Sequence, residues 1–319
     1  MSIIQLEVLY EVPSRTDEDN NIWYKTLSDM HFVNSRVGWV VGSGQILRTQ
    51  NGGGTWANQY INYASQGYLD PNRVFAINPK TCWIIAIGSD TGIRCSYTLD
   101  GGKTWRGKEV KTDLHPNDIF FLDSKRGWIA SDNGHWPAYE GMIHLTNDGG
   151  ESWESRNLGI KGKPLRIRFT SVKKGWLLEE YLDNTSAFSN IHMTDDGGYS
   201  WQLTKRFGRS ISDLYSYNEN HILATGESGF IVKTMDSGKK WKRLGIKCRA
   251  DVNSVAFYDS RRGLAATSSN VLLLSDDGGE TWDRINNLKN YSGALKAHFT
   301  SESTGILMSS ASIYSFKLR

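Results

Sequence analysis

Short runs of alternating apolar and polar residues follow one another along almost the whole chain. Met30 and Phe32 alternate with polar neighbours, and Trp39 and Val41 repeat the pattern after the turn-like segment NSRVG (34–38). Successive side chains of a strand point to opposite faces, so this period of two predicts short β-strands separated by tight turns. No stretch shows a competing helical period, and we therefore expect an all-β protein.

One eight-residue motif, which we call the box, recurs six times. Its pattern is Thr or Ser, any residue, Asp, two Gly, any residue, Ser or Thr, and Trp. The first copy has Asn51 in the Asp place, and the fifth has Ser237 for a Gly and Lys240 for the hydroxyl residue. The six boxes are residues 49–56, 98–105, 146–153, 194–201, 234–241 and 275–282.

A second motif alternates with the box and occurs seven times. An aromatic residue is followed seven positions later by Trp or an aliphatic residue, and the copies are 42 to 48 residues apart. Each repeat holds four short strands, which in the first repeat are predicted at about 28–33, 38–42, 45–49 and 55–60. The pairs are Phe32 and Trp39, Ala76 and Trp83, Phe121 and Trp128, Phe169 and Trp176, Tyr215 and Ile222, Phe257 and Leu264, and Phe299 and Ile306.

Seven repeats of four strands predict an all-β, seven-bladed β-propeller of antiparallel blades that forms a single domain over residues 1–319. The last repeat, 293–318, offers only three strands before the chain ends. A propeller removes its two open edges when the other terminus supplies the missing strand. We expect Ile3–Tyr10 to be that strand rather than Asn21–Lys25, because Trp23 lies unusually close to Phe32.

The composition of the box suits a folding role. Asp or Asn followed by two glycines favours a tight turn with positive φ, and the carboxylate and hydroxyl can accept the N–H groups of that turn. The box Trp is then expected to bury its ring between neighbouring blades. We therefore expect no box Asp to be catalytic or to bind a metal ion.

Composition and charge narrow the class of protein. The 319 residues include 12 Trp and 39% apolar residues, which excludes a disordered chain. A formal charge of +3 is too small to predict a nucleic-acid partner. No apolar run is long enough to span a membrane, and the N-terminus lacks the features of a signal peptide. Three cysteines suggest reduced thiols and a cytoplasmic location.

The sequence offers little for catalysis. It contains no HExxH motif, no Cys/His cluster, no phosphate loop and no G-x-S-x-G motif. His144 and His192 occupy the same place in adjacent repeats, which indicates a recurring strand position rather than a metal site. We expect no catalytic residue, no cofactor and no metal ion.

The recurring Gly-Trp and T-x-D-G-G-x-T-W motifs over residues 28–318 resemble the repeats of the Asp-box (BNR) propellers. Most of all they resemble those of the photosystem II stability/assembly factor family, and that resemblance implies a non-enzymatic, seven-bladed propeller that helps to assemble a membrane complex. Asp-box repeats also occur in sialidases and some endoglucanases. The string LRIR (165–168) lacks the Pro of the sialidase motif. A glycan-binding or sialidase-like glycoside-hydrolase propeller is the alternative.

Long loops are predicted on one face of the propeller, which we call the long-loop face. The loops between second and third strands are longest in repeats two to four, and the longest blade-to-blade connection joins repeats one and two. The box turns belong to the opposite face, the box face. The long loops carry Tyr60, Tyr63, Tyr68, His135, Trp136, Tyr139, Tyr181 and Phe188.

A ring of mixed charge is predicted at the central channel near the long-loop face. It consists of the residues three positions before the aromatic place of each copy of the second motif: Asp29, Arg73, Asp118, Arg166, Ser212, Ser254 and Lys296. Aromatic side chains on loops above a rigid scaffold are typical of binding sites, and arginines can pair with carboxylates of a partner. Together these features favour recognition of another protein or peptide. The predicted partner-binding residues are Arg73, Arg166, Arg168, His135, Trp136, Tyr139 and Tyr181.

The alternative partner is a glycan. Aromatic rings stack on sugars, and glycosidases use a pair of carboxylates. The carboxylates that lie in the same loops are Asp132, Glu140, Glu179, Glu180 and Asp183.

Overall fold

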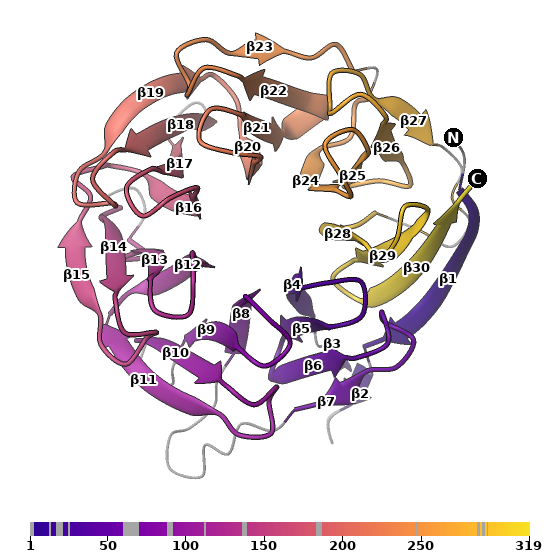
Figure 1. The fold of residues 1–319 in the computed structure, drawn as a ribbon, viewed down its shortest axis with the longest axis horizontal. Helices are drawn as coiled ribbons and strands as arrows, with labels where there is room; N and C mark the ends of the chain where they lie inside the picture. Colours follow the sequence, from indigo (N-terminus) through magenta and orange to yellow (C-terminus); the bar gives the residue numbers. More distant parts are fainter. Residues whose placement is uncertain are drawn as a thin grey trace.

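Seven four-stranded antiparallel sheets form a ring around a central axis in the computed structural model of the chain (Figure 1). The predicted seven-bladed propeller is confirmed. The structure describes residues 3–12, 14–16, 22–24, 26–59, 70–87, 92–111, 113–135, 139–182, 187–246, 248–285, 288, 291 and 293–319.

In blades 1 to 6, the strands follow one another from the axis outward in chain order (Figure 1). The first three blades are β4 (Leu27–Phe32), β5 (Gly38–Gly42), β6 (Gln45–Thr49) and β7 (Ala57–Asn58); β8 (Asp70–Ala76), β9 (Cys82–Ile87), β10 (Ile93–Thr98) and β11 (Arg106–Lys111); and β12 (His115–Phe121), β13 (Gly127–Asp132), β14 (Gly141–Thr146) and β15 (Glu154–Asn157).

The next three blades repeat this order, with one 3-10 turn, η1 (Glu227–Gly229), inside the fifth. They are β16 (Lys163–Phe169), β17 (Gly175–Leu182), β18 (Ala187–Thr194) and β19 (Gln202–Phe207); β20 (Ile211–Ser216), β21 (Ile222–Gly226), β22 (Phe230–Thr234) and β23 (Lys242–Arg243); and β24 (Val252–Phe257), β25 (Gly263–Thr267), β26 (Leu272–Ser275) and β27 (Asp283–Ile285).

Blade 7 is completed by the N-terminus, as predicted. It contains β28 (Lys296–Phe299), β29 (Thr304–Met308) and β30 (Ser312–Leu318), and β1 (Ile3–Glu11) pairs antiparallel with the outer side of β30. The register runs from Ile3 opposite Leu318 to Glu11 opposite Ser312. The rejected segment contains β3 (Ile22–Tyr24), which pairs with β2 (Ser14–Thr16) in a separate two-stranded sheet.

The box turns are held by their own side chains, which confirms their predicted folding role. In the third box, Thr146 Oγ1 accepts the N–H of Gly150 at 2.9 Å. Asp148 accepts the N–H of Ser152 at 3.0 Å and its hydroxyl at 2.5 Å. Although burial acts to raise it, these hydrogen bonds lower the pKa of Asp148 to about 2. The carboxylate is therefore occupied within the turn.

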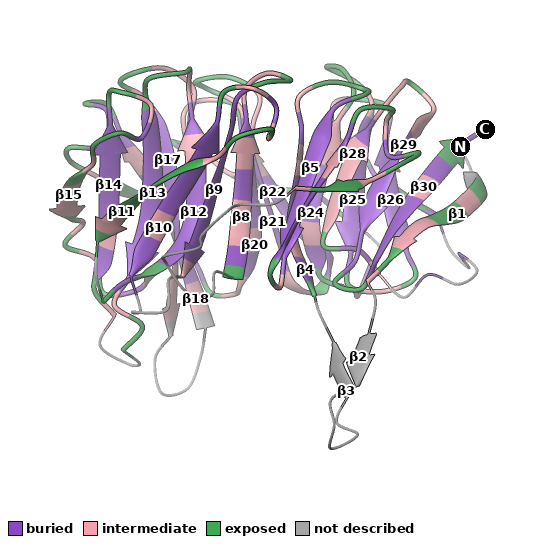
Figure 2. Cartoon of the chain, turned by 90° about the horizontal axis from the view of Figure 1, so that it is seen from below, coloured by how far each residue is buried: buried purple, intermediate pink, exposed green. Residues whose placement is uncertain are grey.

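The residue in the first glycine place, which is Ser237 in the fifth box, ties each box turn to the loop between the first two strands of the same blade. Gly149 has φ of 81° and donates its N–H to Lys125 O at 2.8 Å. A Cβ on Gly149 would lie 2.7 Å from Ser124 O, so both the close approach and the dihedral require glycine. These two turns of each blade lie on one face, and the remaining loops emerge from the other (Figure 2).

A stack of aromatic rings joins neighbouring blades. Phe121 lies flat on Trp83 of the preceding blade with ring centroids 3.7 Å apart, and Trp83 Nε1 donates to Gly149 O at 2.8 Å. The box Trp153 meets the edge of Phe121 at 6.1 Å and is only half-buried, whereas Trp83 is 1% exposed. The main wedge between blades is therefore the second-strand Trp, and the box Trp covers the rim of the same cluster.

The residue at this wedge position differs from blade to blade. At the place of Trp83, blades 1 and 3 have Trp39 and Trp128, and blade 4 has Trp176. Blades 5, 6 and 7 have Leu223, Leu264 and Ile306 there.

The predicted pairing of Tyr215 with Ile222 is wrong by one residue. Tyr215 lies opposite Leu223, and Ser216 lies opposite Ile222. Ser216, not Tyr215, therefore stands at the aromatic place of the first strand in blade 5. Tyr215 is aromatic and lies one position before this place, so the sequence pattern alone assigns the place to Tyr215.

Two further features follow from the described residues. Cys82, Cys95 and Cys248 are all free and buried. None of the described helical segments has the length and apolar character needed to cross a membrane.

Candidate partner-binding site

The charged ring that the sequence predicts lies on the innermost strands, with one correction. Because the frame of blade 5 shifts by one residue, Asp213 takes the place that Ser212 was predicted to fill. The ring positions, taken by register, are Asp29, Arg73, Asp118, Arg166, Asp213, Ser254 and Lys296.

Asp118 is the acidic centre of the arginine cluster. Arg168 Nη1 lies 2.5 Å from Asp118 Oδ2, and Arg73 Nε lies 4.0 Å from Oδ1. The N–H of Ile167, in the next blade, also donates to Oδ2 at 2.9 Å. Burial acts to raise the pKa of Asp118, but the charges of Arg168, Arg166 and Arg73 outweigh burial and lower it. The carboxylate therefore stays ionised.

A second carboxylate, Asp213, shares one of these arginines. Arg166 Nε and Arg168 Nη2 each lie 3.3 Å from Asp213 Oδ1. Burial acts to lower the pKa of Arg168, yet Asp118 and Asp213 raise it above its ordinary value. Arg168 thus bridges blades 3, 4 and 5.

The three arginines remain partly accessible from the channel. Their side chains are 15% to 23% exposed, for Arg166 and Arg73 respectively. Between blades 7 and 1, Lys296 Nζ lies 3.5 Å from Asp29 Oδ1. A carboxylate ligand can approach the guanidinium groups, but it must share them with Asp118 and Asp213.

The loop after β13 is anchored at its base. Asp132 accepts hydrogen bonds from Asn117 Nδ2 and from the N–H of Gly134, both at 2.6 Å. Asn133 Oδ1 accepts the N–H groups of His135 at 3.2 Å and Glu140 at 3.1 Å. One side chain therefore joins both ends of this loop and leaves His135 exposed.

Tyr139, at the end of this loop, reaches towards blade 4. It is half-buried, and burial, followed by the nearby charges of Asp132 and Glu180, raises the pKa of its hydroxyl. Glu180 is the neighbour of Tyr181 near the end of β17, where Tyr181 is also half-buried. The charge of Glu180, in blade 4, thus acts on the hydroxyl of Tyr139, in blade 3.

Trp136 and the tyrosines at positions 60, 63 and 68 lie outside the described residues. The described part of the predicted site therefore consists of two groups. Arg73, Arg166 and Arg168 form one cluster inside the channel, and His135, Tyr139 and Tyr181 belong to blades 3 and 4.

Two carboxylates considered for glycan chemistry are structural. Glu179 is 3% exposed and accepts hydrogen bonds from Asn190 at 2.8 Å and His192 at 2.7 Å. Asp132 is 1% exposed and bound to the loop base. Asp183 lies outside the described residues. Buried and paired carboxylates cannot reach a sugar in solvent.

The histidine in the equivalent strand of blade 3 is also a structural residue. His144 is fully buried and bonds to Ser131 at 2.7 Å and Ser155 at 2.8 Å. Burial lowers its pKa to about 4, so it is neutral at pH 7. The positions that His144 and His192 share hold polar contacts within each blade, and the described residues contain no cluster of three or more metal-ligating side chains.

The fold, the ring and the box turns define this chain as an Asp-box β-propeller. Within that class it resembles the family described as "Photosynthesis system II assembly factor YCF48", whose sequence profile matches residues 147–252. This region runs from the third box to the start of blade 6. Curated protein sequences give no match.

Solved structures show the same fold over the whole chain. YCF48 from Cyanidioschyzon merolae has a TM-score of 0.72 and 19% identity, covering 97% of this chain and 98% of its own. A structure described as "YCF48 bound to D1 peptide" has a TM-score of 0.73 and 18% identity, covering 100% and 98%. Streptogramin B lyase, with a TM-score of 0.72 and 12% identity, covers 99% and 98%. An enzyme and assembly factors thus share this architecture, and function must be argued from sites.

Proposed function

We propose that this protein is a non-catalytic assembly factor, a scaffold that binds a partner protein or peptide on one face of its propeller. The observation that carries the proposal is the match of residues 147–252 to an assembly-factor family. The likeness to a YCF48 structure with a bound D1 peptide supports a peptide-binding role.

The proposed partner docks on the long-loop face and at the channel beneath it. Arg73, Arg166 and Arg168 offer partly exposed guanidinium groups that suit a carboxylate, such as an acidic side chain or a peptide C-terminus. The loop residues His135, Tyr139 and Tyr181, together with Trp136 as the sequence predicts, are the proposed contacts outside the channel. Aromatic and arginine side chains together are the usual anchors of protein interfaces.

The proposed compartment is the cytoplasm. Three free, buried thiols support a reducing environment. Separation of host cells into cytoplasmic and exported fractions, followed by immunoblotting, is the direct measurement, and recovery in the exported fraction would contradict this compartment.

The binding face can be tested by affinity capture from host lysate with three versions of the protein. These are the wild type, Trp136→Ala/Tyr139→Ala and the control Tyr199→Ala, which removes an exposed ring from a box turn on the opposite face. We expect one protein to be captured by the wild type and the control and to be reduced at least tenfold with the double variant. Circular dichroism checks that all three fold alike.

The contrary outcomes are informative. Equal capture by all three versions would move the site away from the long loops. Loss of capture with Tyr199→Ala alone would place the site on the box face. A glycan-array signal in the absence of any captured protein would replace the scaffold with the glycan-binding alternative.

A further inference from the structure

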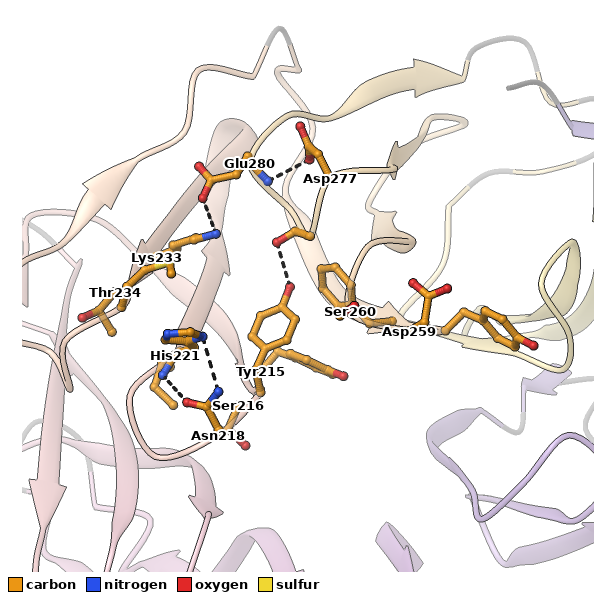
Figure 3. Close-up of a pocket in the computed structure, with 16 residues that line it drawn as sticks. Tyr215, Ser216, Asn218, His221, Lys233, Thr234, Asp259, Ser260, Asp277 and Glu280 are labelled. Carbon is orange, nitrogen blue, oxygen red and sulfur yellow. Dashed lines mark hydrogen bonds and ion pairs between the residues drawn. The ribbon is translucent and has the colours of Figure 1, made fainter.

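A recess of about 600 Å³ opens on the box face between blades 5 and 6 (Figure 3). None of its residues belongs to the predicted partner-binding site. Its lining includes Tyr215, Tyr217, Met235, Phe257, Tyr258 and Asp259.

The recess lies where the aromatic wedge is missing. Between blades 2 and 3, the indole of Trp83 fills the junction and donates to the box carbonyl of Gly149. Between blades 5 and 6, the same strand position holds Leu223. The equivalent carbonyl, Gly278 O, instead accepts the hydroxyl of Tyr217 at 3.3 Å. Tyr217 comes from the loop after β20 and lines the recess together with Gly278.

Aromatic rings form the wall of this recess. Tyr217 lies 4.9 Å from Tyr215 and 4.8 Å from Phe257, measured between ring centroids, and both contacts are edge-to-face. At the rim, Met235 is 52% exposed and Tyr258 is 47% exposed. A recess with aromatic walls and an apolar rim can cover the aliphatic stem of a long side chain.

A comparison of two nearly identical turns shows that one carboxylate beside the recess is unusual. Blade 3 has the sequence DSKRG (123–127), and blade 6 has DSRRG (259–263). In blade 3, Asp123 Oδ1 accepts the N–H groups of Lys125 and Arg126, both at 2.8 Å. Its other oxygen accepts both Nε, at 2.7 Å, and Nη2 of Arg126. Asp123 is thus neutralised within its own turn.

In blade 6, the corresponding arginine is directed elsewhere. Arg262 pairs with Glu302 at 2.7 Å and with Asp276 at 3.4 Å. Asp259 Oδ1 still accepts the N–H groups of Arg261 at 2.8 Å and Arg262 at 2.7 Å. Asp259 Oδ2 has no hydrogen-bond or ion-pair partner among the residues that the structure describes. The two backbone hydrogen bonds, first of all, lower the pKa of Asp259, which keeps it charged.

The other two carboxylates of the recess are already engaged. Glu280 pairs with Lys233 at 2.5 Å and Lys242 at 3.1 Å, on the far side of the recess from Asp259 (Figure 3). Asp277 is engaged by its own box turn through Thr281. The lining therefore contains three carboxylates against one lysine, and only Asp259 presents a free oxygen.

We propose that this recess binds a lysine or arginine side chain presented by an exposed segment of a partner protein. The cationic group pairs with Asp259 Oδ2, and its stem lies against the tyrosine rings and Met235. An ammonium or guanidinium group gains from both a carboxylate and the faces of aromatic rings. The site is on the opposite face from the proposed scaffold site and does not depend on it.

The test uses Met235, at the rim of the recess, as a reporter. The full chain, which has six methionines, is labelled with ¹³C at the methionine methyl groups and observed by NMR. Two probes are titrated: acetyl-Gly-Lys-Gly-amide and its uncharged counterpart, acetyl-Gly-norleucine-Gly-amide. We expect the Met235 signal to shift in a saturable manner with the lysine peptide and to shift at least threefold less with the norleucine peptide. No shift, or equal shifts with both, would overturn the proposal.

Two matched variants separate this site from general surface charge. Asp259→Asn keeps the Oδ1 acceptor, as Asn34 shows by accepting the N–H groups of Arg36 and Val37 in blade 1. It should weaken binding of the lysine peptide about fivefold, the upper range for loss of an exposed charge pair. The control Asp123→Asn should leave the affinity unchanged. Equal affinities for Asp259→Asn and wild type, or equal losses in both variants, would overturn the proposal.

Discussion

At the scale of single residues, the fold depends on places where only a hydrogen atom fits. Gly127 lies opposite Phe121 in the sheet, and a Cβ there would lie 2.5 Å from the Phe121 ring. The same contact recurs at Gly38, Gly175 and Gly263. This spacing explains why a glycine precedes the second-strand residue in these repeats. The glycine lets the first-strand phenylalanine lie flat enough to stack on the preceding blade.

Gly127→Ala should therefore destabilise the protein by overpacking, by about 1–3 kcal/mol in the free energy of unfolding. Urea denaturation followed by tryptophan fluorescence measures the change. The control is Gly245→Ala, because a Cβ on Gly245 has nothing within 4 Å. Comparable losses in the two variants would show that the Phe121 contact is not the cause.

The same scale shows what the sequence could and could not predict. The box turns follow from local chemistry, so their role was predictable from Thr, Asp and Gly at fixed spacing. The sequence pattern does not predict Asp213 as a member of the charged ring, because Tyr215 is aromatic and lies one position before the true aromatic place, Ser216. The recess depends on the direction that Arg262 takes, which the turn DSRRG does not encode. Leu223 at a tryptophan position was the available signal.

At the scale of strands and blades, closure by β1 was predictable because three strands in the last repeat leave one edge unpaired. In the structure, β1 also contributes side chains to packing. Leu6 packs against the cluster of blades 6 and 7, and Leu9 packs against that of blades 7 and 1. The strand thus seals the ring and fills two junctions.

Removal of residues 1–12 should expose the edge of β30 and cause the protein to associate or lose cooperative unfolding. Size-exclusion chromatography with light scattering and thermal circular dichroism measure both effects. A peptide of residues 3–12, added in excess, should restore the monomeric, cooperative state. A truncated chain that stays monomeric and keeps the melting temperature of the full chain would refute this role of β1.

At the scale of the whole molecule, the box turns couple stability to acid. Hydrogen bonds from Thr104 lower the pKa of Asp100 to about 2, and similar bonds, acting against burial, do the same for Asp148 and Asp196. An aspartate in the unfolded chain has a pKa of about 4. As pH falls, the unfolded chain therefore takes up protons first. The contribution of these turns to stability is complete above about pH 4 and is lost towards pH 2.

The triple variant Asp100→Asn/Asp148→Asn/Asp196→Asn should flatten this dependence. The first box already works with Asn51, whose Oδ1 accepts the N–H of Thr55 at 2.9 Å, so the variant should fold. Urea denaturation at pH 5 and pH 3 gives the slope. The reverse change, Asn51→Asp, should steepen it. An unchanged slope in both variants would show that acid sensitivity arises elsewhere.

The pairing of β1 with β30 has a consequence for how the protein is made. Residues 3 and 318 are partners, so β1 leaves the ribosome long before its partner strand β30 is synthesised. Blades 1 to 6 contain only consecutive strands and can form in the order of translation. Blade 7 cannot, and its closure requires the most distant contact in the chain. Until β30 is made, the backbone N–H and C=O groups of β1 are unpaired and can pair with another chain. Binding of a chaperone to β1 would therefore protect the new chain from aggregation most during this interval.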